Sequence, residues 1–159
     1  MELSIAIVDP QHPDAALLVE QLTAELAAAY AHVGLDGSGG FSPADAAVPR
    51  AAFLVARHGG QPVGCGALRP TEDAEIGEIK RMYVAPAARR RGVALAILRR
   101  LEELAREYGY RRIVLETGDR QLEAIRLYER AGYRRIPCYG VYAGRPWSVC
   151  FGRDLAPAQ

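Results

Sequence analysis

The spacing of hydrophobic residues in the first fifty positions predicts a strand, a helix and a loop in succession. The apolar run Leu3–Val8 ends at an Asp-Pro pair and predicts a short strand. Across Asp14–Tyr30, leucines recur at every fourth position, which predicts a helix with one buried face. Residues 34–49 are rich in Gly, Pro, Ser and Asp and predict a long loop with a short helical turn near Pro43 to Ala47. Such loops often border binding sites.

The next three apolar stretches predict an antiparallel meander. Ala51–Arg57 and Pro62–Leu68 flank a Gly-Gly pair, which supplies the positive φ angles of a tight hairpin turn. Ala74–Val84 follows a polar turn and extends the meander by a third strand.

Two helices alternate with the remaining strands. Apolar residues up to Tyr108 share one side of a helix that opens around Gly92, and Gly109 ends it. The later elements expected are the strand Arg112–Thr117, the helix Gln121–Ala131, and the strands Tyr133–Ile136 and Trp147–Leu155.

The order of these elements predicts the fold class. A strand, a helix and a strand follow one another across residues 74–117, which implies a parallel pair joined by a right-handed crossover. We therefore expect an α+β fold (mixed α/β) with a twisted mixed sheet of about seven strands and helices on both faces.

Composition narrows the class of protein. The 159 residues, 50% hydrophobic and 25% charged, suit a single domain over residues 1–159. No segment approaches the roughly 18 consecutive apolar residues of a membrane span, and the first residues do not resemble a signal peptide, so we expect a cytoplasmic protein. The net charge of +1 gives no general attraction to nucleic acid or to a membrane.

The cysteines and histidines indicate neither a disulfide framework nor a metal site. Cys65, Cys138 and Cys150 are odd in number and widely spaced, which argues against a disulfide framework and favours unpaired thiols. The histidines stand apart, and no two have ligand spacing with a cysteine or a carboxylate, so we expect no metal.

The segment after Val84 combines three arginines with the start of a helix. Free N–H groups at a helix N-terminus, together with the helix dipole, form a site for anions. Gly92 lets the backbone approach a phosphate, and the small Ala94 leaves room beside it. Three arginines at a helix start are unfavourable without an anion, so Arg89–Ala94 favours an anionic cofactor.

Other interpretations of this segment fit less well. A nucleotide-hydrolysing P-loop needs GxxxxGK followed by Ser or Thr, and neither Lys-Ser nor Lys-Thr occurs in the chain. A nucleic-acid patch lacks nearby aromatic residues for base stacking. A purely structural helix start stays open as an alternative.

Two motifs together resemble the GCN5-related N-acetyltransferases, the GNAT family. Arg89–Ala94 match the signature Gln/Arg-x-x-Gly-x-Gly/Ala at the start of a helix, and Ala124–Tyr133 match the second motif Ala-x-x-Leu-Tyr-x-x-x-Gly-Phe/Tyr. With the order of elements, the resemblance covers Leu3 to Leu155. It implies that acetyl-coenzyme A binds where the strand ending at Val84 splays from the strand Arg112–Thr117.

The resemblance also implies the cofactor contacts. Main-chain groups at the end of the strand 74–84 would hold the pantetheine arm, the arginine loop would wrap the pyrophosphate, and Gln121 stands where the family often has Asn. The implied contacts are Met82, Tyr83, Val84, Arg89, Arg90, Arg91, Gly92, Val93, Ala94 and Gln121.

Two residues are expected to transfer protons. An amine must lose a proton and the departing thiolate must gain one. Glu78 aligns with the general base of some family members, and Glu116 on the neighbouring strand is the alternative; Tyr128 matches the tyrosine that protonates the thiolate. A surface ion pair of Glu78 and a core role of Tyr128 stay open. Strand alternation predicts one shared face for Glu78, Lys80, Met82 and Val84.

The resemblance also implies that the first helices and the loop between the last two strands build the acceptor pocket. Tyr139 and Tyr142 could pack on an amine, and Arg145 could bind the carboxylate of an amino-acid-like acceptor. Glu116 is counted with these substrate-binding residues. An ordinary hairpin loop is the alternative.

The resemblance therefore implies an N-acetyltransferase that passes acetyl from acetyl-coenzyme A to a primary amine of a small molecule, amino-acid-like or xenobiotic, by direct attack in a ternary complex. Transfer to a protein N-terminus or lysine stays open, as does a non-catalytic acyl-coenzyme A sensor. The presence of both Glu78 and Tyr128 favours catalysis. The fold also allows a homodimer through its terminal strands.

Overall fold

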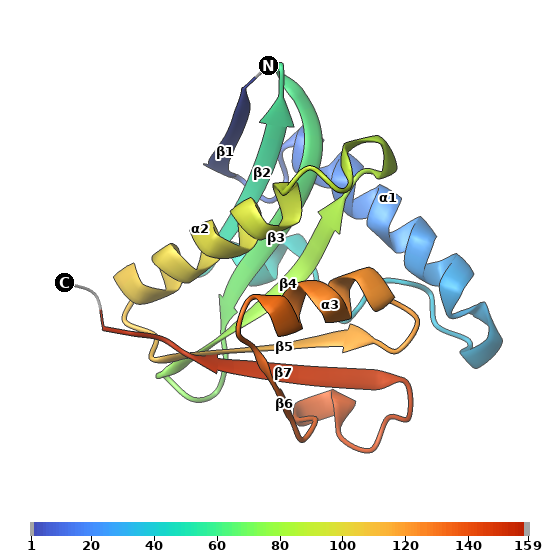
Figure 1. The fold of residues 1–159 in the computed structure, drawn as a ribbon, viewed down its shortest axis with the longest axis vertical. Helices are drawn as coiled ribbons and strands as arrows, with labels where there is room; N and C mark the ends of the chain where they lie inside the picture. The colour runs from blue at the N-terminus through green and yellow to red at the C-terminus, as the bar shows by residue number, and fades with distance from the viewer. Residues whose placement is uncertain (1, 158–159) are drawn as a thin grey trace.

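The computed structural model describes residues 2–157, which build a seven-stranded twisted sheet with the order β1-β2-β3-β4-β5-β7-β6 (Figure 1). The predicted order of elements is confirmed, with ends that move by one or two residues. The strands are β1 (Leu3–Val8), β2 (Ala52–His58), β3 (Gln61–Pro70), β4 (Ile76–Val84), β5 (Arg112–Gly118), β6 (Arg134–Ile136) and β7 (Ser148–Asp154). The helices are α1 (Pro13–Ala29), α2 (Val93–Glu107) and α3 (Leu122–Arg130), with short 3-10 turns η1 (Ala31–Val33), η2 (Pro43–Ala46), η3 (Pro86–Ala88) and η4 (Gly140–Tyr142).

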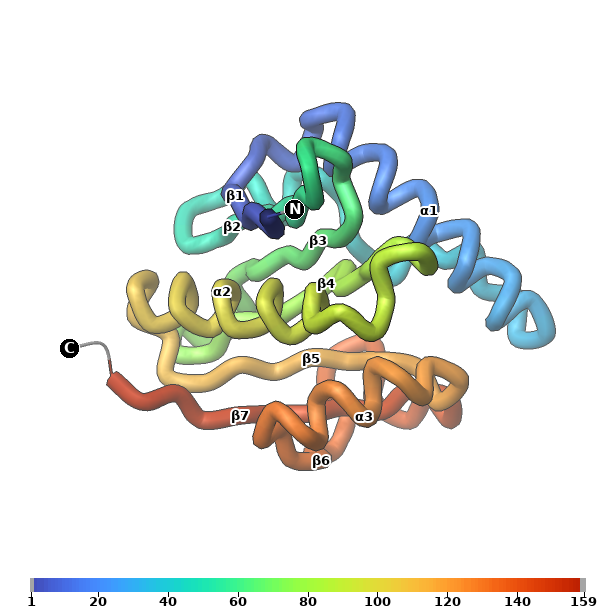
Figure 2. Tube along the Cα trace, turned by 45° about the horizontal axis from the view of Figure 1, so that its top comes forward, coloured from blue at the N-terminus to red at the C-terminus, as the bar shows by residue number. Residues whose placement is uncertain are grey.

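The sheet buries a hydrophobic cluster on each face, because helices cover both (Figure 2). Helices α2 and α3 pack on one face, where Leu98 and Leu101 are fully buried. Helix α1 packs on the other face around Leu18 and Phe53. The mixed fold with helices on both faces is thus confirmed.

Strands β4 and β5 pair in parallel along only part of their length. Ile76–Ile79 of β4 match Arg112–Leu115 of β5, and α2 makes the crossover between the two strands. Beyond these residues the two strands separate, while β4 remains paired with β3 as far as Val84. The separation exposes main-chain groups of β4 and places Glu116, the next residue of β5, beside the gap.

A bulge in β4 changes which side chains share a face. Arg81 has a positive φ of 59°, and the register with β3 shifts opposite it. An extra residue turns every later side chain to the other face. Ile79 and Met82 therefore both pack in the cluster on the α2 face, and Lys80 faces away from it. The prediction of one shared face for Glu78, Lys80, Met82 and Val84 is wrong.

Two of the three cysteines form a disulfide, so the expectation of unpaired thiols is wrong for Cys138 and Cys150. The β6–β7 pairing sets Ile136 opposite Cys150 and brings the loop after β6 back over β7, with 5.2 Å between the cysteine Cα atoms. Sequence spacing alone does not reveal this contact. Cys65 is free and buried, and burial raises its pKa to about 12.

Within residues 2–157, none of the helices combines the length and apolar character needed to cross a membrane. The same residues contain no cluster of three or more His, Cys, Asp or Glu side chains arranged to hold a metal ion.

Candidate active site

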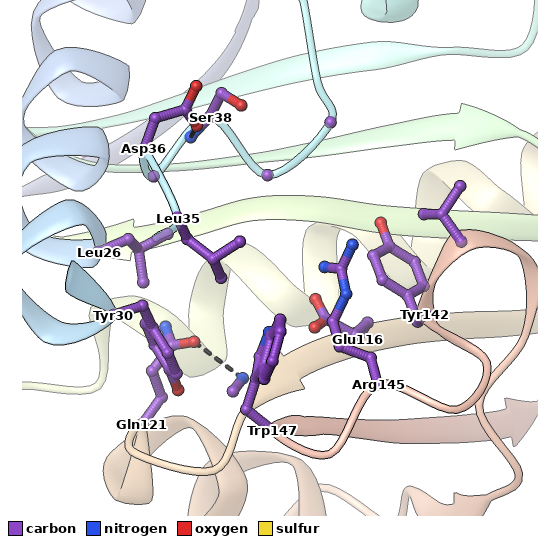
Figure 3. A pocket seen from close by; sticks show the side chains of 15 residues that line it. Leu26, Tyr30, Leu35, Asp36, Ser38, Glu116, Gln121, Tyr142, Arg145 and Trp147 are labelled. Atoms are coloured by element: carbon purple, nitrogen blue, oxygen red, sulfur yellow. Dashed lines mark hydrogen bonds between the residues drawn. The ribbon is translucent and has the colours of Figure 1, made fainter. Parts of the chain in front are cut away.

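Two adjoining cavities lie where β4 and β5 separate. The larger, of about 200 Å³, is bordered by the end of α1, the loop 35–40 and the loop before β7 (Figure 3). The smaller, of about 80 Å³, lies between β4, β5 and α3. Both cavities are lined by Leu26, Gly39, Glu116 and Gln121.

The β4 bulge holds one wall of the larger cavity in place. The displaced Arg81 guanidinium donates hydrogen bonds to the carbonyl oxygen of Gly37 at 3.0 Å and to Oγ1 of Thr23 at 2.6 Å. Gly37 has a φ of 84°, and a Cβ there would overlap the main chain of Thr23 and Ala27. The loop 35–40 therefore packs directly on α1, a contact that the sequence analysis missed.

Glu116 is the carboxylate that faces both cavities. Its Oε2 accepts a hydrogen bond from the Ser148 hydroxyl over 2.7 Å. Burial raises the pKa of Glu116, while Ser148 and the nearby cations Lys80 and Arg145 act in the opposite direction. A carboxyl with a raised pKa and contact with the cavities suits a general base.

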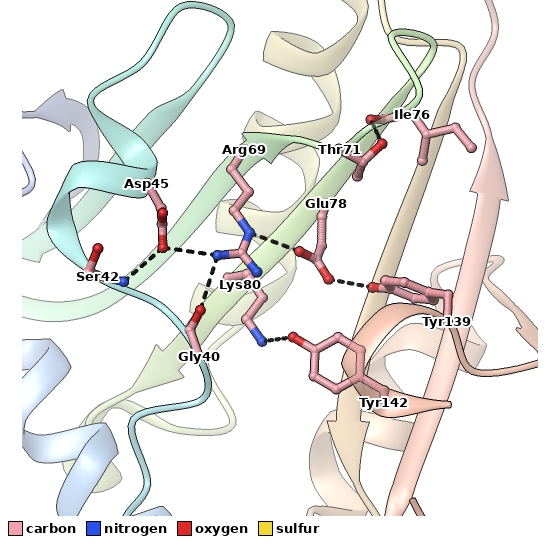
Figure 4. A network of polar contacts seen from close by, with 10 residues as sticks. All are labelled: Gly40, Ser42, Asp45, Arg69, Thr71, Ile76, Glu78, Lys80, Tyr139 and Tyr142. Atoms are coloured by element: carbon pink, nitrogen blue, oxygen red, sulfur yellow. Dashed lines mark hydrogen bonds and ion pairs between the residues drawn. The ribbon is translucent and has the colours of Figure 1, made fainter. Parts of the chain in front are cut away.

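Glu78 is bound on both carboxylate oxygens and lines neither cavity. Nε of Arg69 donates to Oε1 at 2.9 Å, and the Tyr139 hydroxyl donates to Oε2 at 2.6 Å (Figure 4). Glu78 is only 5% exposed, and Arg69 also pairs with Asp45 at 3.1 Å. The geometry favours Glu116, and the role of Glu78 as base stays a prediction.

Lys80 connects β4 with the loop before β7. Its Nζ donates a hydrogen bond to the Tyr142 hydroxyl (Figure 4). Lys80 borders the smaller cavity and Tyr142 the larger. Burial lowers the pKa of Lys80, although Glu78 and Glu116 partly oppose this effect. The sequence analysis treated Lys80 only as a strand residue; its one signal was that all the other basic residues are arginines.

Tyr128 borders the smaller cavity from α3. Its ring packs against Tyr133 and Phe151, with 5.8 Å between centroids in each pair. Within residues 2–157 we find no hydrogen bond to its hydroxyl. Burial, with a smaller contribution from Glu116, raises the pKa of Tyr128, so the hydroxyl stays protonated and can donate its proton.

The arginine loop has an anchored part and an exposed part. Nε of Arg89 donates to the carbonyl oxygen of Val84 at 2.8 Å, and its guanidinium pairs with Glu25 at 2.7 Å. Arg90 and Arg91 are exposed. Arg89 thus fixes the loop, whereas the next two side chains are available to an anion.

The backbone of this loop also suits an anion. Arg90 and Gly92 have positive φ angles of 64° and 79°, which turn the chain into α2 at Val93. The first N–H groups of α2, including that of Ala94, have no acceptor within the helix. A Cβ at Gly92 would meet nothing within 4 Å, so no other part of the described chain packs on this side of Gly92. Phosphate oxygens would fit there.

The other implied cofactor contacts lie along the same cleft. On the side that faces β5, Met82 and Tyr83 have no strand partner among the described residues, which leaves main-chain groups for an extended ligand. The Val84 carbonyl is already bound by Arg89. Oε1 of Gln121 accepts from the N–H of Gly118 at 2.9 Å, so this side chain caps the turn before α3 as well as lining both cavities.

The predicted acceptor loop is only partly brought to the cavity. Tyr142 and Arg145 line the larger cavity, whereas Tyr139 does not and instead holds Glu78. Cζ of Arg145 lies 5.5 Å from the ring centroids of both Tyr142 and Trp147. Trp147 also lines the cavity and was missed, because at the edge of a strand it is indistinguishable from an ordinary core residue.

Comparison with known proteins identifies the family. Residues 19–133 match the model of the GNAT family of acetyltransferases. The chain belongs to the GNAT family. The IAA acetyltransferase of Azospirillum brasilense is 38% identical over 69% of this chain and 71% of its own length. The uncharacterized N-acetyltransferase YjgM of Escherichia coli is 32% identical over 79% of this chain and 77% of its own length.

Solved structures agree with the GNAT assignment. A Klebsiella pneumoniae protein, provisionally described as an acyl-CoA N-acyltransferase, superposes with a TM-score of 0.78 at 30% identity, over 97% of this chain and 98% of its own. A GNAT acetyltransferase from Elizabethkingia anophelis with acetyl-CoA bound shares the fold, with a TM-score of 0.68 at 18% identity over 96% and 98% of the two chains. This GNAT protein is therefore an acyltransferase of a fold that uses acetyl-coenzyme A as co-substrate.

Proposed function

We propose that this GNAT acetyltransferase transfers acetyl from acetyl-coenzyme A to the primary amine of a small molecule, amino-acid-like or xenobiotic, bound in the larger cavity. The observation that carries the proposal is the position of Glu116, which lines the larger cavity and also the smaller one, where Tyr128 lies. A single carboxylate is thus in reach of an amine on one side and of the cofactor cleft on the other.

The β4–β5 cleft would hold the cofactor. Arg90, Arg91 and the first N–H groups of α2 would bind its pyrophosphate, and the free main-chain groups of Met82 and Tyr83 would align its pantetheine arm. The cofactor supplies an acetyl thioester. The smaller cavity, with Tyr128 on its wall, would receive the sulfur end of that arm.

Glu116 and Tyr128 would then carry the two proton transfers. Glu116 accepts the proton that the amine nitrogen loses as it forms the new N–C bond. Tyr128 donates a proton to the sulfur as the C–S bond breaks. The net reaction moves one proton from nitrogen to sulfur, as acetyl transfer to an amine requires.

The size and walls of the larger cavity favour a small acceptor. The loop 35–40 and the loop that carries Tyr142 border a space of about 200 Å³. Arg81 and the disulfide each tether one of these loops to the body of the protein. A protein lysine would need an open groove, so a small amine fits this site better.

The test is thiol release from acetyl-coenzyme A against a panel of small amines and, in parallel, lysine-containing peptides. We expect turnover with small amines and an acetylated product by mass spectrometry. Turnover with peptides alone would replace the proposal with a protein acetyltransferase. Binding of acetyl-coenzyme A, seen as a thermal shift, without turnover on either set would indicate a sensor.

A further inference from the structure

We propose that the acceptor is an amino acid with an apolar side chain, and that Arg145 selects it by binding its carboxylate while Glu116 faces its amine. This inference rests on the proposed function and specifies the substrate class. The structure adds to the sequence prediction the surroundings of Arg145: the charges that line the cavities with it, the two aromatic rings beside it, and the lack of an ion-paired acid among the described residues.

The Arg145 side chain contacts two aromatic rings but no acidic or hydrogen-bonding partner among the described residues. In the part of the chain that the structure describes, its guanidinium forms neither an ion pair nor a side-chain hydrogen bond. It lies 5.5 Å from the ring centroids of Tyr142 and Trp147, which support it from the loop and from the start of β7. An arginine supported by aromatic rings keeps its planar donors for a carboxylate, which it can bind through two parallel hydrogen bonds.

The charges around the cavities leave room for one anionic group. Three cations line the two cavities, Lys80, Arg81 and Arg145, against two carboxylates, Glu116 and Asp36, so one positive charge is left over. Lys80 donates to the neutral Tyr142 hydroxyl and pairs with no acid within residues 2–157. A bound carboxylate at Arg145 would balance this excess positive charge in a partly desolvated site.

The rest of the larger cavity is mainly apolar and aromatic. Leu26, Leu35 and Val141 contribute aliphatic surface, and Trp147 contributes a large flat one (Figure 3). An amino acid with an apolar side chain matches the three kinds of group that line this cavity. Its amine would lie near Glu116, its carboxylate would bind Arg145, and its side chain would pack on the apolar surface.

Carboxylate binding should also assist the base. The charged and titratable groups that interact with Glu116 are Lys80 and Glu78 from β4, Arg145 and Tyr139 from the loop before β7, Tyr128 from α3, Tyr142 from η4 and Tyr30 after α1. Arg145 favours the ionised form of Glu116. When a substrate carboxylate neutralises Arg145, Glu116 holds a proton more strongly and becomes a better base. An amine without a carboxylate should therefore lose kcat as well as affinity.

The experiment compares matched acceptors at saturating acetyl-coenzyme A. Leucine is compared with 3-methylbutylamine and leucinamide, and phenylalanine with 2-phenylethylamine and phenylalaninamide. We expect kcat/KM for the amino acid to exceed that of both relatives without a carboxylate by about ten- to a hundred-fold, the range expected for a charge-assisted bond. Equal values would overturn the inference and leave the proposed function standing.

Variants of Arg145 distinguish binding of the substrate carboxylate from a purely structural role of this side chain. Arg145→Gln keeps most of the stacked side chain and removes the charge, and it should abolish the preference for the amino acid. Arg145→Lys should restore part of it. Arg134→Ala removes an exposed arginine on β6 and should change nothing. Each variant is first checked for an unchanged thermal shift with acetyl-coenzyme A, which shows that the fold and the cofactor site are intact.

The outcomes are distinct. If Arg145→Gln keeps the preference of the wild type, another group binds the carboxylate and the inference fails. If no amine of either kind releases thiol although acetyl-coenzyme A binds, the proposed function itself fails.

Discussion

The Tyr139 hydroxyl donates a hydrogen bond of 2.6 Å to Glu78 and thereby joins the loop before β7 to β4. Arg69 occupies the other oxygen of Glu78 and also pairs with Asp45, so one network connects β3, β4, η2 and the loop before β7. A carboxylate held in this way contributes more to the arrangement of the loops than to proton transfer. Glu116, which has Ser148 as its one hydrogen-bond donor in the described structure, faces both cavities instead.

Replacing Glu78 should therefore affect stability more than chemistry. Glu78→Gln removes a buried acceptor for Arg69 and Tyr139 and should lower the free energy of unfolding by about 1.5 to 3 kcal/mol, as measured in urea. Its kcat should fall far less than that of Glu116→Gln. An unchanged stability combined with lost kcat would identify Glu78 as the base.

Tyr128→Phe should lower kcat with little change in the affinity for acetyl-coenzyme A. The buried hydroxyl has its pKa raised above the ordinary value of 10.0, so it remains a proton donor across the pH range in which the enzyme is stable. Loss of a general acid typically costs about 10²–10⁴-fold in rate. Steady-state thiol release and calorimetric binding measure the two quantities. A variant with full kcat would limit Tyr128 to packing.

The two parts of the arginine loop should respond differently to substitution. Arg90→Ala combined with Arg91→Ala should weaken binding of coenzyme A by about 1.5 to 3 kcal/mol per lost charge-assisted bond and leave the melting temperature of the free protein unchanged. Arg89→Ala should lower that melting temperature, because it removes the bonds to Val84 and Glu25. Calorimetry measures the affinity for coenzyme A, and thermal melts measure the melting temperature of each variant. Equal affinity in the double variant would remove the loop from the cofactor site.

The disulfide should stabilise the loop before β7. Cys138 and Cys150 are 12 residues apart in sequence, and closing a loop of this length in the unfolded chain is worth about 3 kcal/mol. Cys138→Ser should lose this amount in denaturant, and a reductant should bring the wild type to the same value. Three free thiols in the unreduced protein, counted by alkylation and mass spectrometry, would contradict the bond.

Much of the fold followed from the sequence because its signals are local. Spacing of apolar residues, together with Gly34, Gly92, Gly109 and Gly132 at or near helix ends, was enough to place every helix and strand within two residues. The parallel pairing of β4 with β5 followed from a strand, a helix and a strand in succession, since connection rules leave few other arrangements.

The parts that could not be predicted depend on contacts between distant segments. The β4 bulge at Arg81 has no local sequence signature, yet it reverses the faces of all later residues on the strand. The bonds of Glu78 come from β3 and from a loop 61 residues away in sequence. The pairing of Cys138 with Cys150 likewise appears only once β6 lies beside β7. The motifs could thus indicate the family and its cleft, but they could not tell which of two carboxylates lines the cavities.

The most direct test of the account is the pH profile of kcat/KM for the wild type and Glu116→Gln with the same amine. Burial raises the pKa of Glu116 above its ordinary value of 4.5, and a base must be ionised to accept a proton. The wild-type kcat/KM should therefore fall with unit slope as the pH drops through a pKa above 4.5. Glu116→Gln should be slower by about 10²–10⁴-fold and should lack this limb, whereas Glu78→Gln should keep it. A Glu116→Gln variant with the rate and acid limb of the wild type would contradict the account.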